Sequence, residues 1–225
     1  MNLMIKIKFP DGKIQEFPKG VTGLELLQAV PQRLREEATG IKVNGEVKSL
    51  PEPIDQDAEI QILTFEDKEG REVFWHSSAH LMAHAVQRLY PQTKFGIGPA
   101  IEEGFYYDID LDQALTPEDF EKIETVMAKI VEENHPIIRK DLPKKEAVQY
   151  FKKRKEDLKL DLLAELEDGI STYSQGDFTD LCRGPHLPST GRIGKNFKLL
   201  SVAGAYWRGD EKNKMLQRLY ATSYP

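Results

Sequence analysis

The sequence feature that most constrains the fold is the stretch 75–90, WHSSAHLMAHAVQRLY, which contains neither Pro nor Gly. Its apolar positions 75, 79, 82, 86 and 89 recur at the spacing of one face of an amphipathic helix. Beside that stripe lie His76, His80 and His84, three of the five histidines in the chain. Residues four apart on a helix are rotated by only about 40°. The three imidazoles are therefore predicted to form one row, which suits a reactive surface better than a core.

Length and composition indicate an ordinary globular protein. The 225 residues suffice for one large or two small domains with cores of their own. No stretch of eighteen apolar residues occurs, and the first residues alternate like a strand, so neither a membrane span nor a signal peptide is expected. The single cysteine excludes an internal disulfide and suits a reducing compartment. We expect a cytoplasmic protein without membrane contact.

Charge is distributed unevenly along the chain. The net charge is −6, yet residues 139–159 carry nine Lys or Arg against four Asp or Glu, a local balance of +5. Within this segment the run Lys152, Lys153, Arg154 and Lys155 is the densest. A polyanion such as RNA would bind a patch of this kind, whereas the alternative is a solvated helix face.

The first 63 residues predict a small β-grasp domain resembling ubiquitin. Residues 4–9 and 14–17 form a predicted hairpin, and Thr22 with Glu25 marks a capped helix start. A strand at 40–46 contains an Asn-Gly turn, and residues 60–63 form the last strand. This segment has no His or Cys, so we expect docking or binding from it. Residues 64–71 are expected to be a linker, and a second domain is expected at 72–225.

The second domain is predicted to mix helices and strands. Glycines around 96–104 lack the dinucleotide and Walker spacings, so strand and turn structure near a pocket is expected there. A helix is predicted from Pro117 to just before His135, which we interpret as a surface or capping residue. Another helix is expected from Pro143 through Phe151. Residues 158–162 alternate leucines, which predicts a strand with Lys159 on the face opposite the leucines.

The stretch 177–186, DFTDLCRGPH, contains the other reactive side chains. Gly184-Pro185 between Cys182 and His186 makes a helix implausible, and a bend would allow both side chains to enter one cavity. With His80 and His84 they give the pattern HxxxH plus CxxxH. By ligand type this set matches zinc, but it equally matches a cavity that orients a water and moves its proton.

Four strings carry a resemblance to a known family: HSSAHLMAHA (76–85), GPAIEEGFYYD (98–108), DFTDLCRGPH (177–186) and AGAYWRGDEKNKMLQRLY (203–220). Together they resemble the N-terminal half of bacterial threonyl-tRNA synthetases. The resemblance implies an α+β chain: a TGS domain, which is a ubiquitin-like grasp module, followed by a larger α+β editing domain. This editing domain is related to those of alanyl-tRNA synthetases and to free-standing alanyl deacylases.

The function implied by this resemblance is proofreading. Serine lacks only one methyl group of threonine, and such a difference supports roughly 10–200-fold discrimination, so a second sieve is needed. The editing domain would hydrolyse seryl-tRNA(Thr) to serine and tRNA. The catalytic core that attaches threonine to tRNA(Thr), with its ATP and zinc, is expected beyond position 225. We therefore expect a fragment whose partners are tRNA(Thr) and the catalytic and anticodon-binding domains of a homodimeric enzyme.

The resemblance also implies roles for individual residues. A water at the ester carbonyl would be oriented or deprotonated by His80 or His186. Lys159 would stabilise negative charge, and Cys182 and His84 would shape the pocket. The full set of implied site residues comprises the catalytic group His80, His84, Cys182, His186, Lys159 and Asp180, the substrate-binding group Tyr106, Gly98, Pro99 and Arg183, and the tRNA-binding group Lys152, Lys153, Arg154, Lys155 and Arg208. His76 is expected to pack or to support the site from outside.

Two questions remain open from the sequence. We expect that editing requires no metal, although His80, His84, Cys182 and His186 would be the ligands if zinc were bound. The function itself has two alternatives, a free-standing trans-editing deacylase and a non-enzymatic, zinc-stabilised RNA-binding module.

Overall fold

The computed structural model describes residues 3–225, which form two compact units. Unit 1 contains the described residues up to Phe74 together with Gly184–Pro188. Unit 2 contains Trp75–Arg183 and Ser189–Pro225. No helix among the described residues is long and apolar enough to cross a bilayer.

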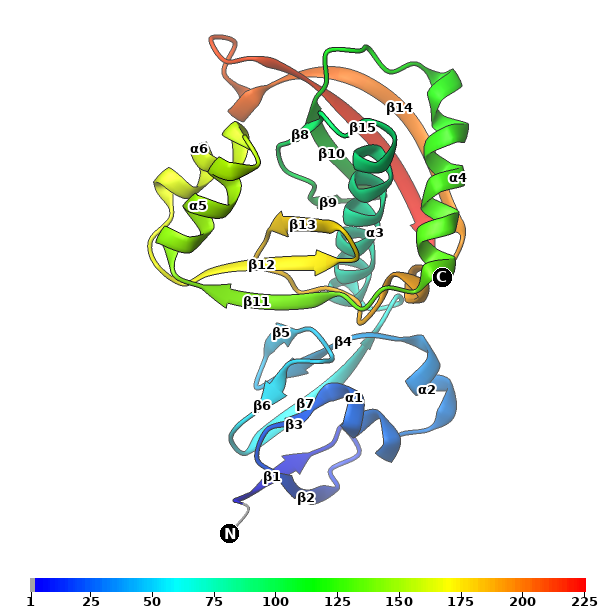
Figure 1. Ribbon diagram of the computed structural model, residues 1–225. Helices are drawn as coiled ribbons and strands as arrows, with labels where there is room; N and C mark the ends of the chain where they lie inside the picture. Colours follow the sequence, from blue (N-terminus) through cyan, green and yellow to red (C-terminus); the bar gives the residue numbers. More distant parts are fainter. Residues whose placement is uncertain (1–2) are drawn as a thin grey trace. The chain divides into compact units, whose positions relative to one another are not determined.

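Unit 1 is built on a five-stranded sheet with the order β2-β1-β7-β4-β5 (Figure 1). Strands β1 and β2 are antiparallel, and β1 pairs in parallel with β7. This arrangement is a β-grasp fold, as predicted. Its elements are β1 (Met4–Lys8), β2 (Ile14–Pro18), β3 (Val21–Thr22), α1 (Gly23–Leu26), η1 (Leu27–Ala29), α2 (Gln32–Glu37), β4 (Ala38–Val43), β5 (Glu46–Lys48), β6 (Pro53–Ile54) and β7 (Ala58–Thr64).

Local sequence signals account for much of unit 1. Alternation in β1 buries Ile5 and Ile7 in the core. Thr22 and Glu25 form the predicted capping box at the start of α1. Asn44 and Gly45 both have positive φ, the conformation that a two-residue type I′ hairpin turn requires between β4 and β5.

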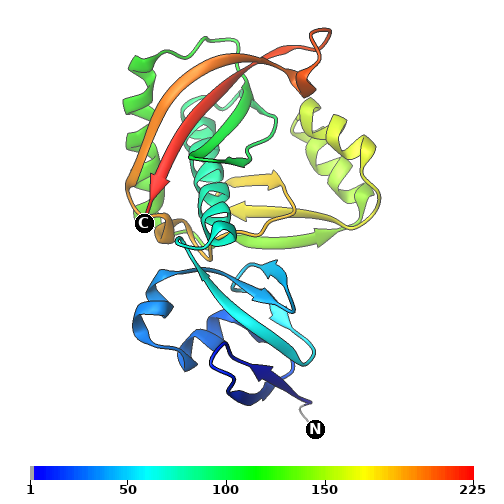
Figure 2. The same ribbon diagram turned by 180° about the vertical axis from the view of Figure 1, so that it is seen from behind.

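Unit 2 contains a curved sheet with the order β14-β15-β10-β8 and a three-stranded sheet, β11-β12-β13. Helix α3 runs through the centre of this unit, with β11–β13 on one side and α4 on the other (Figures 1 and 2). The elements of this unit are α3 (Lys68–Leu89, which begins in unit 1), β8 (Lys94–Phe95), β9 (Ala100–Ile101), β10 (Gly104–Asp110), α4 (Pro117–Glu133), β11 (Ile138–Leu142), α5 (Lys144–Lys153), α6 (Asp157–Glu165), β12 (Ile170–Gln175), β13 (Phe178–Leu181), η2 (Thr190–Ile193), β14 (Asn196–Tyr206), η3 (Trp207–Gly209) and β15 (Met215–Tyr224).

Helix α3 differs from the prediction in two respects. It begins at Lys68, inside the segment expected to be a linker. It is also buried on nearly every side from Val73 to Val86 rather than along one stripe. A helix covered by a sheet, a hairpin and a second helix has little solvent face, so His80 and His84 lie in the interior, whereas His76 is half-buried.

The strand predicted at residues 158–162 is wrong, because these residues belong to helix α6. A helix places Lys159 and Leu163, four residues apart, on one face, and both are buried. The alternating leucines are an ambiguous signal in such a short segment. The helix turns Lys159 into the interior of unit 2.

Candidate functional site

Four buried polar side chains from four different elements meet in unit 2. His80 comes from α3, Asp180 from β13, Lys159 from α6 and Tyr107 from β10. His80 Nε2 lies 3.3 Å from Asp180 Oδ2, and Lys159 Nζ lies 2.5 Å from Asp180 Oδ1. The Tyr107 hydroxyl donates a short hydrogen bond to Asp180 Oδ2. We call these four residues the buried polar network.

Lys159 occupies the centre of this network. Its ammonium group contacts Asp180 Oδ1, donates to Gly96 O at 2.6 Å and donates to the Tyr107 hydroxyl at 3.2 Å. An ammonium group has three N–H donors, and these three acceptors use all of them. In this geometry Lys159 holds Asp180 and does not point a donor at a substrate oxyanion, which differs from the role that the resemblance implied.

The network sets the protonation of its members. Burial alone would raise the pKa of Asp180, but attraction to Lys159 and His80 and the hydrogen bonds from Lys159 and Tyr107 outweigh it and lower the pKa. Burial lowers the pKa of His80 to about 3, against the opposing pull of Asp180. Burial also raises the pKa of Tyr107 well above its ordinary value, with Asp180 adding to the effect. At neutral pH the network therefore holds an ionised Asp180 beside a neutral His80.

His76 and Cys182 extend the site beyond the network. Cys182 Sγ lies 3.3 Å from His76 Nε2, and the rings of His76 and His80 meet edge to face with centroids 5.1 Å apart. A ligand atom from each of His76, His80 and Cys182 lies within 4.8 Å of the others. This departs from the sequence expectation, which assigned His76 to packing or outer support.

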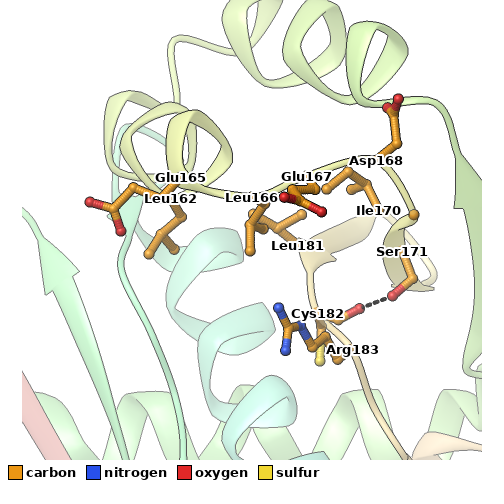
Figure 3. Close-up of a pocket in the computed structure, with 11 residues that line it drawn as sticks. Leu162, Glu165, Leu166, Glu167, Asp168, Ile170, Ser171, Leu181, Cys182 and Arg183 are labelled. Carbon is orange, nitrogen blue, oxygen red and sulfur yellow. Dashed lines mark hydrogen bonds between the residues drawn. The ribbon is translucent and has the colours of Figure 1, made fainter.

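Cys182 and Arg183 line a pocket of about 680 Å³ in unit 2 (Figure 3). The pocket is bounded by the end of α6, the following loop and the start of β12. Ser171 Oγ donates to Cys182 O at 2.6 Å and thereby fixes the backbone at the end of β13. Arg183, expected to bind substrate, lies at the wall of this pocket beside Cys182.

His84 does not join this group. Its Nε2 lies 2.7 Å from Asp177 Oδ1, and its Nδ1 lies 3.4 Å from Gln175 Nε2. Each step of four residues along a helix adds about 40°, so His84 is turned by about 80° from His76 and faces the tip of the β12–β13 hairpin. The sequence analysis took His84 as a potential metal ligand, but His76 lies in the cluster in its place.

His186 is placed by the structure in the segment Gly184–Pro188 of unit 1. Its side chain is fully buried, and its backbone N–H donates to Ser49 Oγ at 2.9 Å. The role expected for His186, to orient or deprotonate a water, stays a prediction.

The expected substrate-binding residues around β10 have different surroundings. Tyr106 packs its ring against the guanidinium of Arg218, 4.0 Å from the ring centroid, whereas the neighbouring Tyr107 points to the buried polar network. Gly98 lies against the Tyr107 ring, since a Cβ at this position would be 2.2 Å from Tyr107 Cδ2. Pro99 accepts a backbone hydrogen bond from Tyr106 at 3.3 Å. Strand alternation thus selects the second tyrosine of the pair for the interior.

The basic residues expected to bind RNA fall into two groups. Lys152, Lys153, Arg154 and Lys155 are all exposed at the end of α5. Arg208 is exposed too, but its guanidinium forms a short ion pair with Glu165 and donates to Asp161 O at 3.1 Å. The α5 run is free of such intramolecular ion pairs among the pairs found in residues 3–225, whereas Arg208 links η3 to α6.

Comparisons with known proteins identify the two units. Residues 5–64 match the TGS domain, and residues 170–220 match the threonyl and alanyl tRNA synthetase second additional domain. The chain therefore combines a TGS domain with an aminoacyl-tRNA synthetase editing domain. More narrowly, almost its whole length is similar to the N-terminal region of threonine–tRNA ligases.

Three of these relatives give the extent of the similarity. The chain is 54% identical over 224 residues to the threonine–tRNA ligase of Parabacteroides distasonis, 52% over 224 to that of Carboxydothermus hydrogenoformans and 54% over 223 to that of Clostridium tetani. These matches cover 98–99% of the chain but only 34–35% of the relatives. The chain thus spans about a third of the length of the proteins it matches.

Proposed function

We propose that unit 2 hydrolyses the ester bond of tRNA(Thr) mischarged with serine. The observation that carries the proposal is the pairing of neutral His80 with ionised Asp180 beside His76 and Cys182. The match of residues 170–220 to the editing domain of threonyl- and alanyl-tRNA synthetases supports the substrate class. Serine is the amino acid that threonine selection cannot exclude by binding alone.

The proposed chemistry is attack of a water on the ester carbonyl of the terminal adenosine. Neutral imidazole accepts a proton, whereas imidazolium does not, and burial keeps His80 neutral at pH 7, so its use as a base depends on the opposing pull of Asp180. Asp180 Oδ2 faces His80 Nε2 and would orient that imidazole. Asp180 would then stabilise the imidazolium as it forms, and the ribose oxygen would leave with the electron pair of the broken ester bond and take up the proton from the imidazolium.

A metal-bound form of the same residues is the second candidate. His76, His80 and Cys182 are ligand types that zinc prefers. Asp180 on the second ring nitrogen of His80 is the partner that zinc-ligating histidines commonly have. Zinc bound here would act on water or hold the fold, and the latter would make the chain a zinc-stabilised RNA-binding module. We retain hydrolysis without a required metal as the proposal.

The larger protein enters as part of the same proposal. Relatives about three times as long are threonine–tRNA ligases, so the region beyond their first third would supply threonine attachment with ATP. tRNA(Thr) would bind unit 2 through the exposed lysines of α5. Homodimerisation and the anticodon-binding domain would likewise belong to that larger protein.

The test is deacylation of seryl-tRNA(Thr) by the 225-residue chain under single-turnover conditions. We expect serine-selective hydrolysis, with threonyl-tRNA(Thr) spared and with the rate lost in His80→Ala, Cys182→Ala. Zinc content after dialysis and the effect of a chelator are measured on the same preparation. Absence of hydrolysis with demonstrated tRNA binding contradicts the proposal, and tightly held stoichiometric zinc with metal-dependent folding favours the second candidate.

A further inference from the structure

A second His–Asp pair lies one helical turn from the first. His80 pairs with Asp180, and His84 pairs with Asp177 at 2.7 Å. The two histidines are separated by about 6 Å along α3, and the two aspartates by three residues, roughly 10 Å of extended chain from the hairpin turn into β13. Helix α3 and the β12–β13 hairpin are therefore joined by two His–Asp pairs. Only the His80–Asp180 pair belongs to the buried polar network.

Gln175 fixes the orientation of the His84 ring. Its amide nitrogen lies 3.4 Å from both His80 O and His84 Nδ1, while its Oε1 has no hydrogen-bond partner among the described residues. The reverse amide orientation would place two acceptor oxygens together at His80 O. His84 Nδ1 is therefore an acceptor, and the proton lies on Nε2, where it is donated to Asp177.

One partner of His84, Gln175, is the last residue of β12, and the other, Asp177, lies in the hairpin turn that follows. Gln175 pairs with Phe178 across a two-residue loop formed by Gly176 and Asp177, and Gly176 has positive φ. Phe178 stacks on the His84 ring with an interplanar angle of 18°. Additional bonds to Asp177 come from α3, from Gln87 Nε2 at 3.1 Å and Arg88 Nη2 at 3.3 Å. One face of α3 thus holds the end of β12, the turn and the start of β13.

We propose that His84, Gln175 and Asp177 form a positioning clamp that sets where Asp180 meets His80. Asp180 lies on β13, three residues after Asp177 of the turn that leads into this strand, so any slide of the turn along α3 displaces its carboxylate. His84 is then a positioning residue, which contacts no substrate and acts through the hairpin. The expected effect of the clamp on the hydrolysis rate rests on the proposed hydrolytic function.

The experiment compares Asp177→Ala with Asp177→Asn in the 225-residue chain. The Asp177 side chain is 65% exposed, so its truncation leaves the core intact. Two readouts are taken: the single-turnover rate of seryl-tRNA hydrolysis together with the Kd for tRNA, and the imidazole ¹⁵N resonances of His80. Glu132→Ala, which breaks an exposed ion pair with Lys195 elsewhere in unit 2, serves as the matched control.

We expect Asp177→Ala to lower the rate roughly ten- to hundredfold with the Kd unchanged, because small misplacements of reacting groups have costs of this order. The His80 resonances should shift in the same variant. Asp177→Asn retains an oxygen acceptor for His84 Nε2–H, so it should keep the wild-type rate and the wild-type His80 resonances. Gln175→Met should lower the rate and shift the resonances as Asp177→Ala does. Wild-type rate and resonances in Asp177→Ala, or an Asn variant as impaired as Ala, would overturn the clamp. A wild-type chain without hydrolysis refutes the proposed function, while the resonances still decide the clamp.

Discussion

Replacing Lys159 by Met provides the most direct test of the buried polar network. Lys159 and Asp180 are each 2% exposed, and the ammonium lies 2.5 Å from the carboxylate. Methionine has a similar length and flexibility, so the substitution removes the charge and its three hydrogen bonds without creating a large void. It leaves a buried carboxylate whose remaining contacts are the Tyr107 hydroxyl and the neutral His80.

The expected cost is about 3–5 kcal/mol at pH 7, the range found when one partner of a buried ion pair is removed. The sign of the pH dependence follows from Asp180. Its lowered pKa in the wild type stabilises the fold above the unfolded value of 3.8, and this contribution is lost as pH falls. Without Lys159, burial raises the pKa instead, so the penalty increases as pH rises. The difference between the two proteins should therefore be smallest near pH 4 and largest at neutral pH.

Tryptophan fluorescence during urea unfolding isolates the relevant unit, because Trp75 and Trp207 both lie in unit 2. The variant Lys159→Met, Asp180→Asn removes the stranded charge and should recover part of the lost stability. A cost below about 1 kcal/mol for Lys159→Met, a cost independent of pH, or a double variant less stable than the single one would refute the reasoning.

Three further predictions concern RNA binding, pH and packing. Lys152→Glu, Lys153→Glu should weaken tRNA binding and reduce the slope of log affinity against log salt by roughly 0.7–0.9 per lost phosphate contact; an unchanged slope in filter binding would remove these lysines from the RNA surface. Hydrogen bonds with Arg88 and His135 lower the pKa of Glu133 to about 2. The stabilisation by Glu133 should persist above the unfolded value of 4.5 and disappear as pH falls toward 2, so urea midpoints of wild type and Glu133→Gln should converge on acidification, whereas a constant gap contradicts the ion pair. Gly98→Ala should displace the buried Tyr107 ring and lower the free energy of unfolding by about 1–3 kcal/mol. An unchanged urea midpoint would show that the backbone around Gly98 adapts.

Local signals in the sequence predicted unit 1 well. Its hairpins and its capped helix depend on residues a few positions apart, such as Thr22 with Glu25 and Asn44 with Gly45. Hydrogen bonds and φ preferences at this range do not depend on the rest of the fold. The same holds for α4, where Thr116 and Pro117 mark the first turn.

The site was predictable by residue type and less so by geometry. His80, Asp180 and Lys159 do meet, but which histidine of the row enters the cysteine cluster depends on the angle at which α3 lies against the hairpin. That angle is set by tertiary packing, and periodicity cannot distinguish His76 from His84. Tyr107 could have been found from strand alternation with Phe105 and Ile109, both fully buried. Gln175 had no sequence signal, since its contacts arise only after the hairpin docks.

The separation of the site residues along the chain has a consequence for synthesis of the protein. Cys182 and His76 are 106 positions apart, and the hairpin reaches α3 only after the intervening helices and strands exist. A ribosome adding about 5–20 residues per second needs roughly 5–20 s to cover that distance. During this interval the nascent helix carries its histidines without the strand that encloses them. The interior of unit 2 is therefore completed only after β13 has been synthesised, by a long-range closure rather than by local folding.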